Sequence, residues 1–188
     1  MMKIMPDEEL EKCGVKIELV DDNLTEMRAE IAGPPDTPYE GGKFDLEIKV
    51  DTAYPYMPPK IRFKNRLWHP NVCSATGVIC PDMLDKNWTP AMSLRTVMLA
   101  LQAMLADAEL NNPLVVLVAC QYINNYDQYW KTAEHWTKVY AGGPRSQPDC
   151  DEKIQCLKAM GVHEIIARNL LSMYNWNLEK ASERVSSN

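Results

Sequence analysis

The sequence predicts an α+β fold in which an antiparallel sheet comes first and helices follow. Three observations indicate this fold: four short alternating runs near the N-terminus, helical spacing from residue 93 onward, and a Gly/Pro-rich break before the last segment. With 188 residues, 46% of them hydrophobic, the chain can bury one sizeable core and still form a small second unit. We therefore expect a four-stranded meander with flanking helices, followed by a small three-helix bundle.

The predicted strands lie between residues 15 and 63. Apolar and charged residues alternate in 15–19 and 27–31, and again in 44–50 after the turn-rich GPPDTPYEGG; a shorter run covers 61–63. Period two puts successive side chains on opposite faces, and the residues between the runs are turn formers. This pattern is typical of an antiparallel meander with one buried face.

The periodicity stops between Trp68 and Pro90. A connection of this length inside a compact domain is usually functional or disordered. Its Trp, Ile, Leu and Met content argues against disorder. We expect an ordered loop that carries function.

Helical spacing follows the loop. Ser93 is suited to cap a helix over 94–105, and Pro113 is suited to the first turn of a second helix, PLVVLVACQYINN. A third amphipathic run covers 129–140.

The glycine- and proline-rich break divides the chain. We expect a first domain over 1–143, a linker over 144–149 and a second domain over 150–188. In the second domain, Gly161 stops one helix and Asn177 caps the last, so short helices share a marginal core.

Composition excludes several classes of protein. A net charge of −6 argues against nucleic-acid binding, no apolar run reaches 18 residues, and the N-terminal MMKIMPDEELEK carries acids where a signal peptide would be apolar. The six cysteines form no C-x-x-C pair and only three histidines accompany them, so we expect no metal site. Reduced thiols indicate the cytoplasm or the nucleus.

A series of motifs then indicates a family. In order, the segments are GPPDTPYEGG, YPYMPPK, HPN, the loop cysteine Cys80 and WTPAMSL. Each is weakly specific alone, but together they resemble the ubiquitin-conjugating enzymes over roughly residues 15–143. The resemblance implies that fold for 1–143 and acyl transfer in two steps: a cysteine takes ubiquitin from an activating enzyme, and a lysine or a ligase cysteine then attacks the thioester.

Cys80 is the candidate nucleophile. A thiolate is a strong nucleophile, and an ordered loop exposes reactive groups on a rigid scaffold. The other cysteines are interpreted as small buried hydrophobes, the commonest role of free cysteine, and they are Cys13, Cys73, Cys120, Cys150 and Cys156.

Asn71 and His69 belong to the same candidate site. The resemblance implies that the Asn71 amide donates to the oxyanion, alone or combined with structuring the loop; the alternative is an ordinary turn residue. By the same resemblance His69 is a structural loop residue and not a general base.

The motif departs from the family at the residue expected to accept the proton of the attacking lysine. Family members often carry an acid or a serine directly before the proline that opens the next helix, where this chain has Asn112. An amide cannot accept a proton as a carboxylate can. Asp82 lies nearby in sequence, whereas Asp85 is interpreted as a solvated loop acid. Two further departures from the family pattern are Pro81, where Leu is usual, and the short N-terminal segment PDEELEKC. The short segment predicts that the activating enzyme charges this protein slowly.

A ligase-docking surface is also implied. The resemblance matches one loop at Pro55, Tyr56 and Met57 and a second at Trp88, Pro90 and Ala91. An aromatic side chain framed by prolines is a rigid anchor for a partner. The alternative, above all for Trp88, is ordinary core packing.

Residues 150–188 resemble a ubiquitin-associated (UBA) domain. The resemblance rests on Met160, Gly161 and Val162 and on the segment NWNLEKASERV. Val162 is smaller than the usual aromatic residue, and Arg184-Val185 replaces a Leu pair, so the ubiquitin site loses apolar area. The domain either keeps weak ubiquitin binding, is a structural remnant, or binds something else.

Three functions compete. The first is an active conjugating enzyme, which can build polyubiquitin chains; its partners are ubiquitin, the activating enzyme, a RING-type or HECT-type ligase and protein substrates. The second is a catalytically weak relative that serves as a binding module in the ubiquitin pathway. The third is a cysteine hydrolase using Cys80 and a histidine. No cofactor is expected, because the chain has no G-x-x-x-x-G-K-[ST] phosphate loop and the activating enzyme consumes the ATP.

Overall fold

The structure is a computed structural model that describes residues 10, 12–20, 23–85 and 88–186. The predicted N-terminal segment PDEELEKC lies largely outside the described residues. No helix in the described ranges is long and apolar enough to span a membrane.

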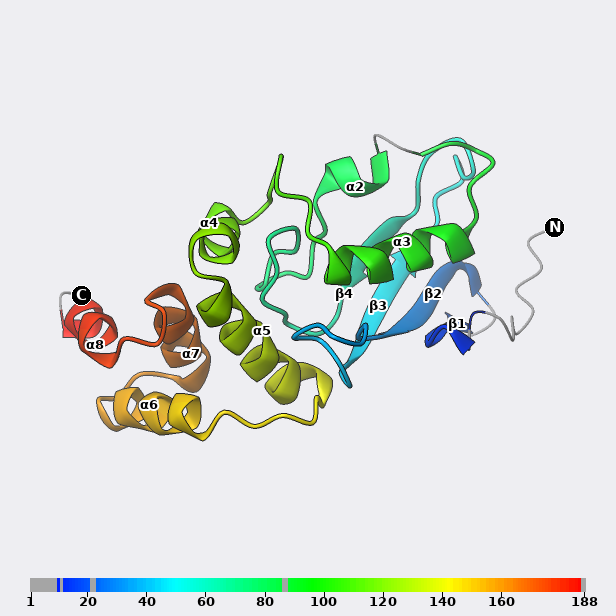
Figure 1. Cartoon of the computed structure of the whole chain (residues 1–188). Coiled ribbons are helices and arrows are strands. Elements are labelled where there is room, and N and C mark those ends of the chain that lie inside the picture. The colour runs from blue at the N-terminus through cyan, green and yellow to red at the C-terminus, as the bar shows by residue number, and fades with distance from the viewer. Residues whose placement is uncertain (1–9, 11, 21–22, 86–87, 187–188) are drawn as a thin grey trace.

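The four alternating runs form strands, as predicted. Among the described residues they make one antiparallel sheet in the order β1-β2-β3-β4 (Figure 1). The strands are β1 (Val15–Val20), β2 (Asn23–Ala32), β3 (Lys43–Lys49) and β4 (Lys60–Phe63).

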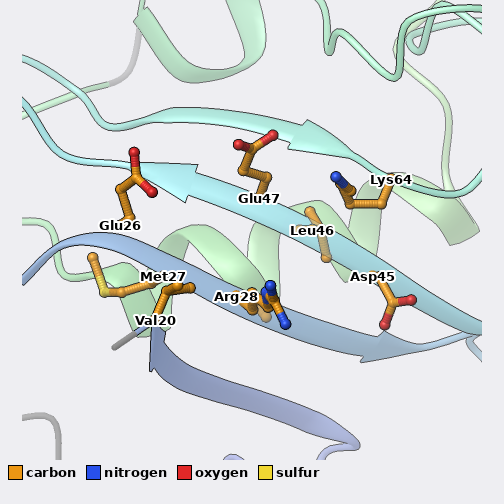
Figure 2. Close-up of a pocket in the computed structure, with 9 residues that line it drawn as sticks. Val20, Glu26, Met27, Arg28, Asp45, Leu46, Glu47 and Lys64 are labelled. Atoms are coloured by element: carbon orange, nitrogen blue, oxygen red, sulfur yellow. The ribbon is translucent and has the colours of Figure 1, made fainter. Parts of the chain in front are cut away.

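The two faces of the sheet differ because the sequence alternates. Phe44, Leu46 and Ile48 of β3 are fully buried. The opposite face is charged and carries a hollow of about 360 Å³, and Figure 2 draws the residues that line it. Acidic and basic side chains share its lining, among them Glu26, Arg28, Asp45, Glu47 and Lys64.

Helix α3 (Leu94–Ala106) packs its apolar side into the main core, and Figure 1 shows it lying across the sheet. Ser93 caps it as predicted: the Ser93 hydroxyl accepts from the Thr96 N–H, and the Thr96 hydroxyl accepts from the Ser93 N–H. This reciprocal pairing satisfies two backbone donors at the start of the helix.

The helices around the long loop differ from the prediction at the start of one helix and in one additional short helix. Helix α4 (Val116–Asn124) begins three residues after Pro113, because the Val115 N–H donates to the Pro70 carbonyl at 2.9 Å and the preceding residues follow the loop. Inside the long loop, α2 (Pro81–Asp85) adds a short helix that the sequence did not predict, since five residues show no helical period.

Helix α5 (Tyr126–Ala141) contains the predicted run 129–140. It begins three residues earlier, where the Asn125 side chain accepts from the Gln128 N–H. It ends at Gly142, whose φ of 71° is a left-handed conformation that suits glycine. Trp136 packs against Trp68 with ring centroids 5.3 Å apart, so α5 belongs to the main core.

Three further helices follow in the described residues, and we call them the C-terminal bundle (148–186). They are α6 (Pro148–Ala159), α7 (Glu164–Met173) and α8 (Leu178–Ser186). Pro148, assigned to the linker from sequence, instead fills the first turn of α6. Asn177 caps α8 by accepting from the Lys180 N–H at 3.0 Å. The bundle core consists of Cys150, Ile154, Leu157, Ala167, Leu171, Trp176 and Ala181.

The bundle is docked on α5, which lies between it and the sheet in Figure 1. The Trp176 indole donates to the Thr132 hydroxyl, and the Trp136 indole donates to the Ser172 hydroxyl, each at 2.9 Å. Arg168 of α7 is also buried and reaches α5. Buried polar groups of this kind are satisfied only while the two parts stay together.

The cysteine prediction was partly wrong. None of the six cysteines is in a disulfide, and Cys150 is buried as expected. Cys13, Cys120 and Cys156 are exposed, because they lie in a turn or on outward helix faces, and Cys73 is half-buried.

Candidate active site

Cys80 lies at the end of an ordered, strand-like pairing inside the long loop. Its N–H donates to the Asn71 carbonyl at 2.9 Å, and Val72 pairs with Ile79. The turn between them requires Gly77, because its φ is 73° and a Cβ there would lie 1.8 Å from the Phe63 carbonyl oxygen. The part of the loop from Asn71 to Cys80 is therefore an ordered structure, as the sequence predicted, although it lacks regular periodicity.

His69 ties this loop to α3. Its Nδ1 accepts from the Asn71 N–H at 3.0 Å, so Nε2 carries the proton and donates to the Met104 carbonyl at 3.0 Å. The ring is buried, and desolvation lowers the pKa of His69 to about 4. At neutral pH this histidine is uncharged and both nitrogens are occupied.

The Asn71 side chain holds the loop that precedes α4. Its amide nitrogen donates to the Glu109 carbonyl at 2.7 Å, and its oxygen accepts from the Glu109 N–H at 2.9 Å. Asn71 is completely buried. The Asn71 side chain thus pairs with both backbone groups of Glu109, as a neighbouring strand would, and holds the 107–115 segment in place.

That segment brings Asn112 beside Cys80. Cys80 is only 5% exposed, and its thiol donates to the Asn112 carbonyl over 3.6 Å. The Asn112 side-chain amide donates to the Asp82 carboxylate at 2.5 Å. Asn112 and Asp82, which lie 30 positions apart in the sequence, are therefore in direct contact next to the thiol.

The histidines do not form a nucleophile–base pair with Cys80. His69 is occupied as described, and buried His135 of α5 faces the C-terminal bundle, where it accepts from the Arg168 guanidinium at 3.2 Å. His163 caps α7. Within the described residues no three His, Cys, Asp or Glu side chains converge on a metal position. The chemistry available at the site is that of a thiol, an amide and a carboxylate.

The two loops matched to ligase docking lie together. The Trp88 indole donates to the Pro55 carbonyl at 2.8 Å and its ring contacts Tyr54. Tyr56 is 79% exposed and Met57 is 58% exposed. Pro90 and Ala91 are exposed as well. Trp88 therefore supports the loop, and the residues that project are Tyr56 and Met57.

The predicted ubiquitin-binding triplet lies in the connection between α6 and α7, which Figure 1 shows on the other side of α5 from the sheet. Met160 is 49% exposed, and Gly161 takes a φ of 86°. Val162 is half-buried against the bundle core.

A four-stranded meander, flanking helices and an ordered cysteine loop define the ubiquitin-conjugating fold. Residues 2–137 match the family model described as ubiquitin-conjugating enzyme. The chain belongs to the ubiquitin-conjugating enzymes, and this membership favours an enzyme over a pure binding module.

Relatives cover nearly the whole chain. The chain is 59% identical over 181 residues to ubiquitin-conjugating enzyme E2-22 kDa of Drosophila melanogaster, covering 96% of this chain and 91% of the relative. It is 49% identical over 186 residues to human ubiquitin-conjugating enzyme E2 K, covering 99% and 93%. A solved ubiquitin-conjugating E2 domain of Toxoplasma gondii superposes with a TM-score of 0.66 at 42% identity, covering 71% of this chain and 92% of the other. The family implies ubiquitin, an activating enzyme and ligases as partners.

Proposed function

We propose that Cys80 is the cysteine that carries ubiquitin. It attacks the thioester of the activating enzyme, takes the ubiquitin C-terminal acyl group, and releases the enzyme's cysteine. A substrate lysine then attacks the new carbonyl, a C–N bond forms, the C–S bond breaks, and Cys80 leaves as thiol. The observation that carries the proposal is the thiol in a rigid loop, with Asn112 and Asp82 at its side.

Asn71 serves this reaction in two ways. Its contacts with Glu109 keep the 107–115 segment beside the thiol. An amide nitrogen has two hydrogens and the Glu109 contact uses one, so the second is the donor we assign to the oxyanion. Loss of one such donor lowers rates by about 10²–10³ in other enzymes.

The test is a charging assay with activating enzyme, ATP and ubiquitin, read on non-reducing gels. We expect an adduct that disappears with thiol reductant and with Cys80→Ala, and a reductant-resistant ester with Cys80→Ser. Cys73→Ala, the matched control in the same loop, should charge normally. An adduct that survives Cys80→Ala would assign the chemistry to another residue.

Ligase docking is proposed for the surface around Tyr56 and Met57. An exposed aromatic residue beside prolines loses little entropy when a partner binds. Tyr56→Ala should weaken stimulation by a RING-type ligase and leave charging unchanged. Tyr126→Ala, which changes an exposed tyrosine on α5, should leave both stimulation and charging unchanged. Equal loss of stimulation in both variants would contradict the assignment. A HECT-type ligase can be tested with the same pair.

We further propose that residues 150–188 are a UBA-like domain that binds ubiquitin through Met160, Gly161 and Val162. Met173 on α7 is 47% exposed, close to the 49% of Met160, and offers a matched control. In titrations of labelled full-length protein with ubiquitin, Met160→Ala should lose binding and Met173→Ala should keep it. If wild type does not bind, the bundle has a structural role. The unpaired cysteines support a reducing location, the cytoplasm or the nucleus.

A further inference from the structure

Helix α4 presents an apolar side to solvent. Val116 and Ile123 are 64% and 63% exposed, Leu117 is 38% exposed, and Cys120 is exposed as well. These positions are spaced by three and four residues, so they share one face of the helix, and the buried residues of α4 lie on its other side. Figure 1 shows α4 at the margin of the molecule, before the start of α5. We call Val116, Leu117, Cys120 and Ile123 the α4 face.

The sequence around this face carries no charge. From Leu110 to Tyr126 there is no Asp, Glu, Lys, Arg or His, although 24% of the chain is charged. Asn124, which lies beside the face, turns its side chain back and donates to the Cys120 carbonyl at 2.9 Å. A helix at the surface normally carries charged residues on its outer side, and a contiguous apolar area there marks a contact with another protein.

We propose that the α4 face binds the α4 face of a second copy of this chain, with the two helices antiparallel about a twofold axis. In such a contact one surface pairs with itself, so the surface must be self-complementary. Cys120 lies near the middle of the face, and an apolar side chain lies toward each end, Val116 and Ile123. The two Cys120 side chains therefore meet at the axis, and Val116 of one copy meets Ile123 of the other.

Charge favours a second copy as the occupant of this face. Each copy has a net charge of −6, so two copies repel each other in most orientations. The neutral run 110–126 lets them approach without bringing like charges together, and it offers no charge to attract an oppositely charged protein.

The size of the face sets the strength of the contact. A helix of nine residues is about 14 Å long, so two such helices bury less than the roughly 1,600 Å² of a stable interface. We therefore expect a weak dimer whose population depends on protein concentration.

The test is sedimentation equilibrium of the full-length protein, kept reduced so that no disulfide joins two copies, at increasing concentration. The average mass should rise from 21.4 kDa toward twice that value. Val116→Glu should weaken association about tenfold or more, because it buries a charge without a counter-charge at both ends of the contact. The control Ile166→Glu places the same charge on an isoleucine of α7 that is 54% exposed, and it should associate as wild type does. Both positions are exposed, so both variants should fold.

A mixture of two variants tests the antiparallel pairing. Val116→Glu and Ile123→Lys should each associate weakly alone and recover when mixed, because the new carboxylate of one copy then meets the new ammonium of the other. Recovery requires that the two positions face each other across a dimer. Cys80→Ala should associate as wild type does, since the contact does not use that thiol, so a failure of the function proposed above would leave this result unchanged.

Three results would overturn the proposal: a wild type that stays at 21.4 kDa, equal weakening by Ile166→Glu, or a mixture that does not recover. Titration with ubiquitin separates another occupant. A monomeric wild type that binds ubiquitin and loses it in Val116→Glu would assign the α4 face to ubiquitin instead of a second copy.

Discussion

The main core and the C-terminal bundle reach stability by different means. The main core joins the inner face of the sheet, α3 and α5 in one large apolar cluster. The bundle buries few apolar side chains. At its border Trp176 and Arg168 donate hydrogen bonds to α5, and Ser172 accepts one from α5. A unit of about forty residues rarely has enough core to be stable alone. The comparison teaches that the bundle depends on polar contacts with α5 that the main core does not need.

The first prediction concerns a substitution that should destabilise the main core and the bundle together. Trp136 is fully buried, packs against Trp68 in the main core and donates to Ser172 of the bundle. Trp136→Ala should lower the free energy of unfolding by about 3–5 kcal/mol, measured by urea denaturation. Trp130→Ala, a half-buried tryptophan on the same helix, should lose less. A loss confined to the bundle would show that Trp136 does not join the two regions.

The second prediction uses two buried histidines, His69 inside the main domain and His135 of α5 at the border with the bundle. Burial lowers the pKa of His69 and of His135 to about 4, below the ordinary 6.5. In the unfolded chain these two histidines therefore bind protons from pH 6.5 downward, whereas in the folded protein they stay neutral until about pH 4. Stability should be complete above pH 6.5 and fall as the pH decreases to about 4, by up to about 1.4 kcal/mol per pH unit for each histidine.

Variants separate the two histidines in that titration. His135→Gln should remove one histidine's share of the slope, measured by urea denaturation at pH 7, 6 and 5. His163→Gln changes an exposed histidine and should keep the full slope. An unchanged slope in His135→Gln would mean that this ring does not resist protonation.

The third prediction isolates one interface hydrogen bond. Thr132→Val keeps the shape but leaves the buried Trp176 indole N–H without its acceptor and also removes the bond from the Thr132 hydroxyl to the Gln128 carbonyl. The unpaired indole N–H should reduce stability by about 1–3 kcal/mol. Thr137→Val, on the same helix, removes only a bond to the Ala133 carbonyl and should change less. Hydrogen exchange should rise in α7 and α8 for the first variant alone. Equal hydrogen exchange in the two variants would mean that the bond between Trp176 and Thr132 does not hold the bundle on α5.

The smallest effect is expected on the charged face of the sheet. Arg62 contacts Glu47 at 2.5 Å, but its side chain is 52% exposed. Water screens such pairs, so Arg62→Ala should lower stability by about 1 kcal/mol or less, and by less still in 1 M salt. Denaturation at low and high salt measures this difference, and a larger loss would mean that the outer face supports the sheet more than its exposure indicates.

Much of the fold could be predicted because its signals are local. Period two marked the strands, and Ser93 and Asn177 marked helix starts, since a capping side chain acts within three residues. The α4 boundary was missed because Val115 donates to Pro70, a partner 45 positions earlier in the chain. No pattern of neighbouring residues records such a contact.

The candidate site was predictable in its side chains but not in its connections. The motifs singled out Cys80, Asn71 and Asn112, yet Asn71 binds the backbone of Glu109, and any residue type offers the same backbone groups. The contact between Asn112 and Asp82 joins positions 30 apart and depends on the folded loop. The interface between α5 and the bundle was missed for the same reason.

Docking of the bundle on α5 also bears on how a bound partner would meet Cys80. On a flexible linker, a captured molecule explores a volume set by linker length, and its effective concentration is an average over that volume. A bundle fixed to α5 instead holds a captured molecule at one distance and in one direction from Cys80. A partner then gains reactivity only if one of its lysines falls at the thiol in that geometry, so docking acts as a selector of acceptor sites as well as a means of retention.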